Sequence, residues 1–277
     1  MEAWFDHWLK GKPLREFTGD PVRLFRMGGA DGSRTTAGRF HHGGEWTTTT
    51  AWPPPDARPV RYFIQNGGVL ATSAASSAEA RHYVFDPDNP VPSIGGRYAN
   101  GGTPGCAQDQ VCNPKIPGCK DSLPLNQRAD VLSYSTPPLE APLTVTGKLR
   151  ARLWISSDAP DTDFTAKLID VYPNGYALIL ADGQIRARYR SGFERAQMLE
   201  PGRVYPVDID LASTSNLFAA GHRIRLDISS SNYPKFDPNP NTGEAAGRWT
   251  RRVKARNSVW HGGARASYVE LPVVGRR

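Results

Sequence analysis

The sequence lacks any run of 18 apolar residues, so we expect no helix that spans a membrane. It begins without the basic and apolar regions of a secretory signal peptide, so we expect a soluble protein whose localisation is unknown. Cysteine is scarce, with Cys106, Cys112 and Cys119 in one loop. Their C-x5-C-x6-C spacing fits no zinc site and leaves two alternatives, one local disulfide with an odd cysteine or three free thiols.

The overall composition is typical of a folded protein rich in turns. Hydrophobic residues make up 39% and aromatic residues 10% of the chain, which argues against a disordered protein. The 27 glycines and 24 prolines favour short strands joined by many turns. A length of 277 residues allows one or two domains, and we expect two unequal ones.

A net charge of +7 raises the question of nucleic-acid binding. Arg186, Arg188 and Arg190 alternate with less polar residues, so we expect them on the wet face of a strand. The dense basic run from 248 to 256 has no ladder of interleaved aromatic residues. We therefore expect a solvated basic surface and no nucleic-acid partner.

The N-terminal region resembles a piece of a larger α/β unit. Apolar residues at helical spacing predict one amphipathic helix over 2–10. Its apolar stripe consists of Trp4, Phe5, Trp8 and Leu9 and needs a partner to cover it. A strand is predicted over 21–27, and a single helix and strand cannot bury their own apolar surface. The turn-rich stretch 28–59 is expected to be an irregular linker.

The rest of the chain predicts an antiparallel β-sandwich, because strand patterns recur with only turns and loops between them. Asp182-Gly183 is interpreted as the turn of a hairpin. We therefore divide the chain into an α/β remnant with its linker at 1–57 and a sandwich domain at 58–277. The expected strands cover 60–65, 81–85, 144–157, 165–171, 175–181, 183–190, 203–211, 222–230 and 267–274.

Catalytic and metal-binding patterns are weak. No G-x-S-x-G turn is present, and the run Ser229-Ser230-Ser231 beside His222 has no flanking glycines, so no catalytic residue is assigned. Asp161-Thr162-Asp163 could open a calcium loop, but the following ligand positions are missing. A turn whose aspartates cap their own backbone is favoured, and neither a metal nor a cofactor is predicted.

Several blocks, in the same order, resemble the cocaine esterase and X-prolyl dipeptidyl aminopeptidase family of serine hydrolases. The similarity extends over nearly the whole chain, except for the cysteine loop, which looks like an insertion. The blocks are Phe5-Asp6-His7-Trp8-Leu9-Lys10-Gly11, the strand at 22–28, Asp86-Pro87-Asp88-Asn89-Pro90-Val91-Pro92-Ser93-Ile94-Gly95-Gly96, 130–134, 161–175 and 221–237.

The resemblance implies an α/β-hydrolase domain with a helical cap, followed by a jelly-roll similar to galactose-binding modules. The catalytic Ser, Asp and His of the family precede the helix with which this sequence begins. The chain would then be the C-terminal portion of a serine esterase or X-Pro dipeptidyl-peptidase, with the catalytic domain as partner and a small acyl ester or peptide as substrate. A homodimer is also possible.

The resemblance further implies that the loop after Gly96 helps to wall the acyl pocket. In this chain the loop reads Arg97-Tyr98-Ala99-Asn100, so Tyr98 and Asn100 are the expected substrate-pocket residues. Two rival functions remain, a stand-alone carbohydrate-binding jelly-roll and an interaction module. An exposed coplanar pair of aromatic rings would favour carbohydrate binding, whereas a bare apolar patch around Trp4, Phe5 and Trp8 would favour the hydrolase.

Overall fold

The computed structural model describes residues 2–13, 19–97, 105–245 and 247–275. The fold is mainly β and largely antiparallel, preceded by one short helix, α1 (Glu2–Lys10). The strands are β1 (Val22–Gly29), β2 (Gly43–Thr49), β3 (Ala57–Gln65), β4 (Val69–Ala71), β5 (Glu79–Phe85), β6 (Leu132–Ser135), β7 (Leu143–Ser157), β8 (Asp163–Val171), β9 (Ala177–Arg186), β10 (Tyr205–Phe218), β11 (Arg223–Ser229), β12 (Ala255–His261) and β13 (Tyr268–Val274).

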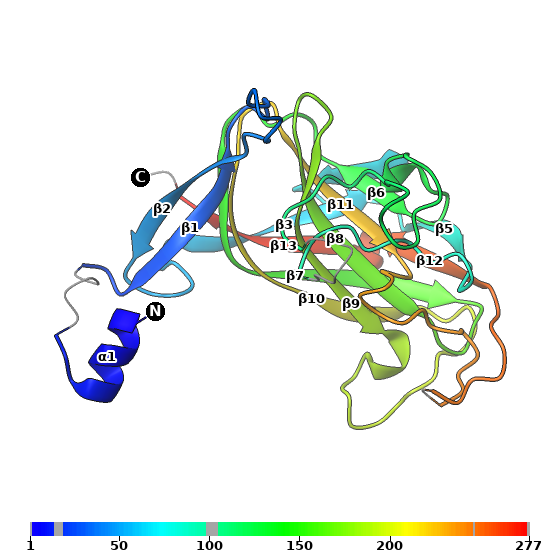
Figure 1. Cartoon of the computed structure of the whole chain (residues 1–277). Coiled ribbons are helices and arrows are strands. Elements are labelled where there is room, and N and C mark those ends of the chain that lie inside the picture. Colours follow the sequence, from blue (N-terminus) through cyan, green and yellow to red (C-terminus); the bar gives the residue numbers. More distant parts are fainter. Residues whose placement is uncertain (1, 14–18, 98–104, 246, 276–277) are drawn as a thin grey trace.

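The strands form one curled sheet in the order β2-β1-β10-β7-β13-β3-β4-β6-β11-β8-β9, with β12 joined to β7 and β5. Figure 1 shows the sheet folding over itself, so that β8 and β11 face β7 and β10 across the core. Among the described strands, only the β1/β10 and β4/β6 pairings are parallel. The predicted mainly β sandwich, preceded by a short helix and strand, is confirmed.

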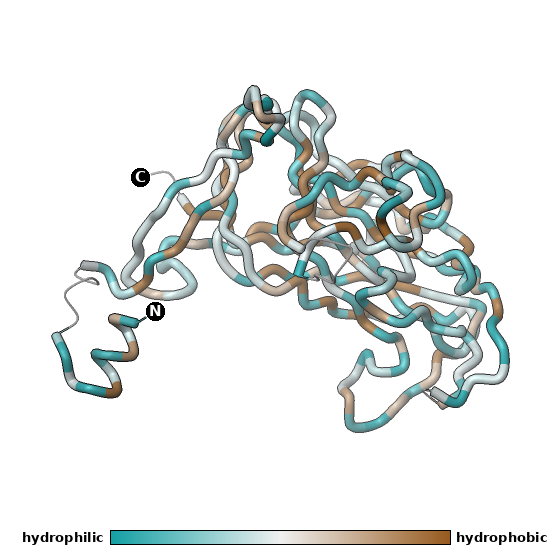
Figure 2. The backbone as a smooth tube through the Cα atoms, viewed as in Figure 1, coloured by the Kyte–Doolittle hydropathy of each residue, from teal (hydrophilic) through white to brown (hydrophobic). Residues whose placement is uncertain are grey.

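The core follows from alternation along the long strands. On β7, Leu149, Ala151, Leu153 and Ile155 are fully buried, while Lys148 on the other face is exposed. This period of two places one face of the sheet inward and leaves the other wet. Burial of such apolar area is the main contribution to folding free energy. Figure 2 shows hydrophobic positions gathered along the strands of the sandwich.

The stretch 28–59 is not irregular as expected, because it contains β2. This strand pairs antiparallel with β1 from Val22↔Thr49 to Arg26↔Glu45. The Phe25 and Trp46 rings stabilise the pair with their centroids 5.5 Å apart. Threonine and tryptophan favour strands, but glycine disfavours them, so the glycines in this stretch led to the prediction of an irregular segment.

The predicted hairpin at Asp182-Gly183 is wrong, because both residues lie inside β9. The turn between β8 and β9 is at 172–176 instead, where Gly175 has a φ of +88°. Gly183 is needed for a close approach between strands. A Cβ atom there would lie 2.1 Å from the carbonyl oxygen of Asp210 on β10.

Replacing Gly183 with alanine should lower the free energy of unfolding by about 1–3 kcal/mol, because the strands must separate to admit the methyl group. Urea unfolding monitored by tryptophan fluorescence measures the loss. Gly275→Ala is a matched control, since nothing lies within 4 Å of a Cβ atom at that position. Equal stability of the two variants would contradict this explanation of Gly183.

Candidate functional site

Helix α1 carries an apolar face that nothing in the described part of the chain covers. Trp4 and Phe5 are each 47% exposed, Trp8 is 64% exposed and Leu9 is 76% exposed. The polar side is organised locally, since Asp6 forms ion pairs with Lys10 at 2.6 Å and Lys12 at 2.7 Å. The predicted stripe at helical spacing is therefore confirmed, and it lies bare.

Further exposed aromatic residues lie on the ribbon of β1 and β2. Trp46 is 62% exposed and Phe25 is 39% exposed, with the Arg23 guanidinium 5.0 Å from the Trp46 ring centroid. Figure 1 shows α1 and this ribbon at the same end of the molecule. We call this set the N-terminal apolar surface: Trp4, Phe5, Trp8, Leu9, Phe25 and Trp46.

The ribbon is joined to the sandwich by a short ladder. β1 pairs with β10 only at Met27↔Asn216 and Gly28↔Leu217. Gly28 has a φ of +81°, and a Cβ atom there would lie 2.3 Å from the carbonyl oxygen of Leu217. Glycine therefore permits the close backbone contact that holds the ribbon in place.

A second candidate region lies where the segment Pro92–Arg97 meets the loop after β11. Ser93 donates its backbone N–H to the Tyr233 carbonyl at 2.6 Å and its hydroxyl to Asn232 Oδ1 at 2.9 Å. Gln110 Nε2 donates to the Ile94 carbonyl at 2.9 Å. Two of the sequence blocks that carry the family resemblance are thus in direct contact.

Asp182 holds this region in place through hydrogen bonds, and its side chain is buried, with the residue only 1% exposed. Its carboxylate accepts hydrogen bonds from Lys235 Nζ at 2.6 and 2.7 Å and from Asn232 Nδ2 at 2.8 Å. Its backbone carbonyl accepts one from Arg97 Nη2 at 3.1 Å. Charge-assisted hydrogen bonds of this kind make the root of the following loop rigid.

The root of that loop is closed by two backbone hydrogen bonds between Gly96 and Cys106, at 2.7 and 2.9 Å. Gly96 has a φ of +75° and lies against Asp182, whose Oδ1 would be 3.0 Å from a Cβ atom. Tyr98 and Asn100, the expected substrate-pocket residues, lie outside the described residues. Their role stays a prediction.

Asp161 and Asp163 form neither a calcium loop nor a self-capping turn, because both are fully buried in ion pairs. Arg188 Nε donates to Asp161 at 2.7 Å, and Arg186 Nε donates to Asp163 at 2.9 Å. Asn239 Nδ2 donates to both carboxylates at 2.8 Å. Burial raises the pKa of Asp163, and the hydrogen bond from Arg186 opposes that rise.

These buried ion pairs also correct the prediction that the arginines at 186–190 lie on the solvent-exposed face of a strand. Arg188 is 6% exposed, and Arg186 is partly covered by the loop that carries Asn239. Alternation alone could not reveal this, because the partners Asp161 and Asp163 lie more than twenty residues earlier in the chain. Within the described ranges, no group of three or more acidic, histidine or cysteine side chains could hold a metal ion.

The serine and histidine residues near β11 do not form a nucleophile and base pair. Ser230 is 1% exposed, and its hydroxyl bonds to the Tyr83 hydroxyl and to Asn257 Nδ2, each at 2.7 Å. His222 Nδ1 instead bonds to Asp170 Oδ1 at 2.8 Å. The Ser230 hydroxyl and the His222 imidazole are thus each bonded to other buried groups inside the sandwich.

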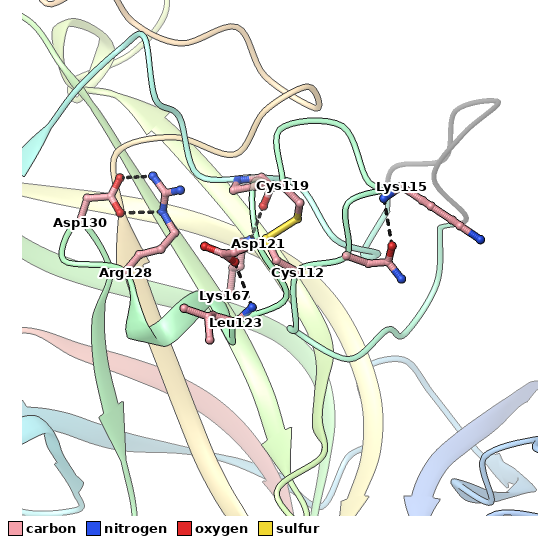
Figure 3. The surroundings of a disulfide bond; sticks show 10 residues. Cys112, Lys115, Cys119, Asp121, Leu123, Arg128, Asp130 and Lys167 are labelled. Carbon is pink, nitrogen blue, oxygen red and sulfur yellow. Dashed lines mark hydrogen bonds and ion pairs between the residues drawn. A yellow bond between two sulfur atoms is a disulfide. The ribbon is translucent and has the colours of Figure 1, made fainter.

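The cysteine loop contains one disulfide, between Cys112 and Cys119, and Cys106 is a free and exposed thiol. The first of the two sequence alternatives is therefore the one observed. Figure 3 shows the disulfide beside the Arg128–Asp130 ion pair and above Lys167. The bridged segment packs on a small second core made by Val91, Ile94, Cys112, Leu125 and Val131, with Ile116 and Cys119 beside it.

Lys167 on β8 is a buried cation beneath this second core. Burial lowers the pKa of Lys167 to about 8, while the nearby carboxylates Asp182 and Asp227 raise it. The ammonium keeps its proton at neutral pH, so the folded state carries the cost of burying a charge.

The stability of the protein should increase as the pH rises from about 8 to 10. In this window the unfolded chain keeps the proton on Lys167, whose ordinary pKa is 10.5, whereas the folded protein releases it. The free energy of unfolding then rises by roughly 1 kcal/mol per pH unit, and below pH 8 this contribution is flat. Urea titrations at several pH values measure it, and Lys167→Met should remove the rise. A slope that persists in Lys167→Met would assign it to another group.

Comparison with known proteins decides the family. The sequence profile of the X-Pro dipeptidyl-peptidase C-terminal non-catalytic domain matches residues 18–270. The chain belongs to this family. It is 39% identical to the cocaine esterase of Rhodococcus sp. over 99% of this chain and 45% of that protein. It is 22% identical to a putative Xaa-Pro dipeptidyl-peptidase of Bacillus anthracis, over 84% of this chain and 32% of that protein.

Two solved structures share this architecture over nearly the whole chain. An aminopeptidase from a Thaumarchaeota archaeon is 28% identical with a TM-score of 0.77, over 99% of this chain and 43% of that one. An α-amino acid ester hydrolase is 27% identical with a TM-score of 0.75, over 98% of this chain and 44% of that one. The chain thus spans less than half the length of these relatives. No described helix is long and apolar enough to cross a membrane.

Proposed function

We propose that this chain is the C-terminal, non-catalytic portion of an α/β serine hydrolase of the cocaine esterase type. Its role is to pack on a catalytic domain that supplies the Ser, Asp and His, and to complete the pocket for a small acyl ester. Two findings support an ester over an X-Pro peptide as substrate. The chain is 39% identical to a cocaine esterase but 22% identical to a putative Xaa-Pro dipeptidyl-peptidase.

The bare N-terminal apolar surface is the observation that carries this proposal. A helix of nine residues is too short to be stable in water alone, and the four apolar residues of its stripe are between 47% and 76% exposed. Exposed apolar patches of this kind are characteristic of protein contacts. We assign the contact to the catalytic domain, because the resemblance makes α1 and β1 the last elements of that domain.

The aromatic rings of this surface are poorly suited to the rival role in carbohydrate binding. The Trp4 and Trp8 rings are inclined by 52°, and the Phe25 and Trp46 rings by 68°. Neither pair offers the coplanar platform on which a sugar ring would stack. The same surface suits a partner that packs around each ring separately.

We further propose that the loop rooted at Arg97 and Cys106 walls the acyl pocket, with Tyr98 and Asn100 facing the substrate. Its root is fixed by Asp182 and by the Gly96–Cys106 bridge, which supports a role that requires a defined position. We also keep 58–277 as the autonomous domain. The short β1/β10 ladder supports a boundary close to the start of β3 at Ala57.

A binding experiment tests the proposed docking surface. The portion of the Rhodococcus cocaine esterase that precedes the matched region is mixed with this chain, and the dissociation constant is measured by calorimetry. Trp8→Ser should weaken binding about tenfold or more, because buried aromatic anchors dominate interface energies. Phe193→Ser is the matched control, since Phe193 is 80% exposed and lies outside this surface. Equal effects of the two substitutions would contradict the assignment.

A further inference from the structure

Two charged side chains face each other beneath the disulfide-bridged segment. Lys167 on β8 is the direct cross-strand partner of Asp227 on β11, so both project from the same face of the sheet. Each is only 4% exposed. The second core covers them through Val91, Leu125 and Val131. Both charges are therefore removed from bulk water.

The ammonium of Lys167 has too few acceptors within the described residues. It makes one long hydrogen bond, 3.4 Å to the carbonyl of Pro92, although it has three N–H donors. Asp227 forms its own ion pair with Arg225, at 3.1 Å, and accepts a hydrogen bond from Ser133 at 2.7 Å. No carboxylate oxygen of the described chain lies within the 4.0 Å of an ion pair with Lys167. A buried ammonium is costly unless some other group accepts hydrogen bonds from its free N–H donors.

A small cavity lies at this point. It offers about 10 Å³ to the centre of a water-sized sphere and is lined by Val91, Leu125, Val131, Lys167, Asp227 and Ser229. A volume of roughly 10–15 Å³ on this measure holds one water molecule. The space is too small for a metabolite or a polyatomic anion. Apolar cavities of this size stay dry, but this one has polar groups on one side.

We propose that Lys167, Asp227 and Ser229 hold one water molecule in this cavity. The water accepts a hydrogen bond from Lys167 Nζ and donates to the Asp227 carboxylate. Its second hydrogen faces Ser229 Oγ, which bonds to Thr165 at 2.6 Å and donates to the Ser231 carbonyl at 3.1 Å. A hydroxyl oxygen has two lone pairs, so one remains for the water. Three hydrogen bonds are the usual number for a buried water.

The water connects the sheet to the segment that leads into the loop at Arg97. Lys167 bonds to the carbonyl of Pro92, and Ser93 follows with its bonds to Asn232 and Tyr233. A hydrated ammonium therefore supports the same segment that Asp182, its cross-strand neighbour on β9, holds through Asn232 and Lys235. This inference concerns the internal structure of the chain and does not depend on the proposed hydrolase function.

A crystal structure of the full chain at about 1.5 Å resolution tests the site directly. The expected result is one ordered water within hydrogen-bond distance of Lys167 Nζ and an Asp227 carboxylate oxygen. An empty cavity, or a direct Lys167–Asp227 ion pair that closes it, would overturn the proposal.

A cavity-filling substitution tests the site in solution. Val131→Ile adds a methyl group to the lining and should expel the water, so the urea midpoint should fall and water relaxation dispersion should show one fewer long-lived water. Val84→Ile is the matched control, because Val84 is 53% exposed, and its midpoint should not change. A midpoint of Val131→Ile that is raised or unchanged would show that the cavity is dry and overturn the proposal.

Discussion

The chain by itself is expected to hydrolyse p-nitrophenyl acetate and an X-Pro-p-nitroanilide only at the background rate. Covalent catalysis needs an activated nucleophile with a base in hydrogen-bond reach. Ser230 is buried and bonded to Tyr83 and Asn257, and the imidazole of His222 is bonded to Asp170. Spectrophotometric assays of the purified chain measure the rate.

The control for this prediction is Ser230→Ala, assayed beside the unchanged chain after circular dichroism has shown that both are folded. Both proteins should give the same background rate. Saturable turnover that is present in the unchanged chain and lost in Ser230→Ala would contradict the assignment of the chain as non-catalytic.

Replacing Asp161 with alanine should lower the free energy of unfolding by about 3–5 kcal/mol, because it leaves a buried guanidinium without its partner. Asp161 is fully buried and accepts hydrogen bonds from Arg188 Nε and from the Arg188 backbone N–H, at 2.7 and 2.9 Å. It also accepts one from Asn239, which holds the loop after β11. Chemical denaturation measures the loss.

Asp208→Ala is the matched control for this loss. Asp208 also pairs with an arginine through two hydrogen bonds, from Arg152 at 2.6 and 3.0 Å, but both side chains are about 40% exposed. Exposed ion pairs contribute about 0–1 kcal/mol. Similar losses for Asp161→Ala and Asp208→Ala would mean that burial of the Asp161 pair has no special effect.

The sandwich could be predicted because its long strands alternate. β7 and β10 each place one face in the core. Apolar residues at every second position of the sequence therefore correspond to buried positions. The helix at 2–10 could be predicted in the same way, from apolar residues at helical spacing. These signals are local, and local signals need no knowledge of distant partners.

The errors arose where a partner distant in sequence decides the structure. Asp182-Gly183 has the composition of a turn, but Lys235 binds the carboxylate and Asp210 lies against the glycine. Arg188 follows a strand-like alternation, yet Asp161 draws it into the interior. The burial of Lys167 could not be predicted from the sequence, because a single lysine in a strand pattern is ordinarily exposed.

The candidate region around Ser93 and Asn232 could be predicted only through resemblance. The contact between Ser93 and Asn232 joins residues 139 apart, and no periodicity connects them. The bare face of α1 was predictable from spacing, because a stripe on a short helix with no apolar run nearby needs a partner. Its assignment to a catalytic domain depends on the family.

The most direct test of the central claim is the ester hydrolysis rate of a chimera. In it, this chain replaces the matched portion of the Rhodococcus cocaine esterase, to which it is 39% identical. The account predicts saturable hydrolysis of p-nitrophenyl acetate by the chimera, with no turnover above background by this chain alone. A chimera that folds but turns over no faster than the preceding esterase portion alone would contradict the claim that this chain completes such an enzyme.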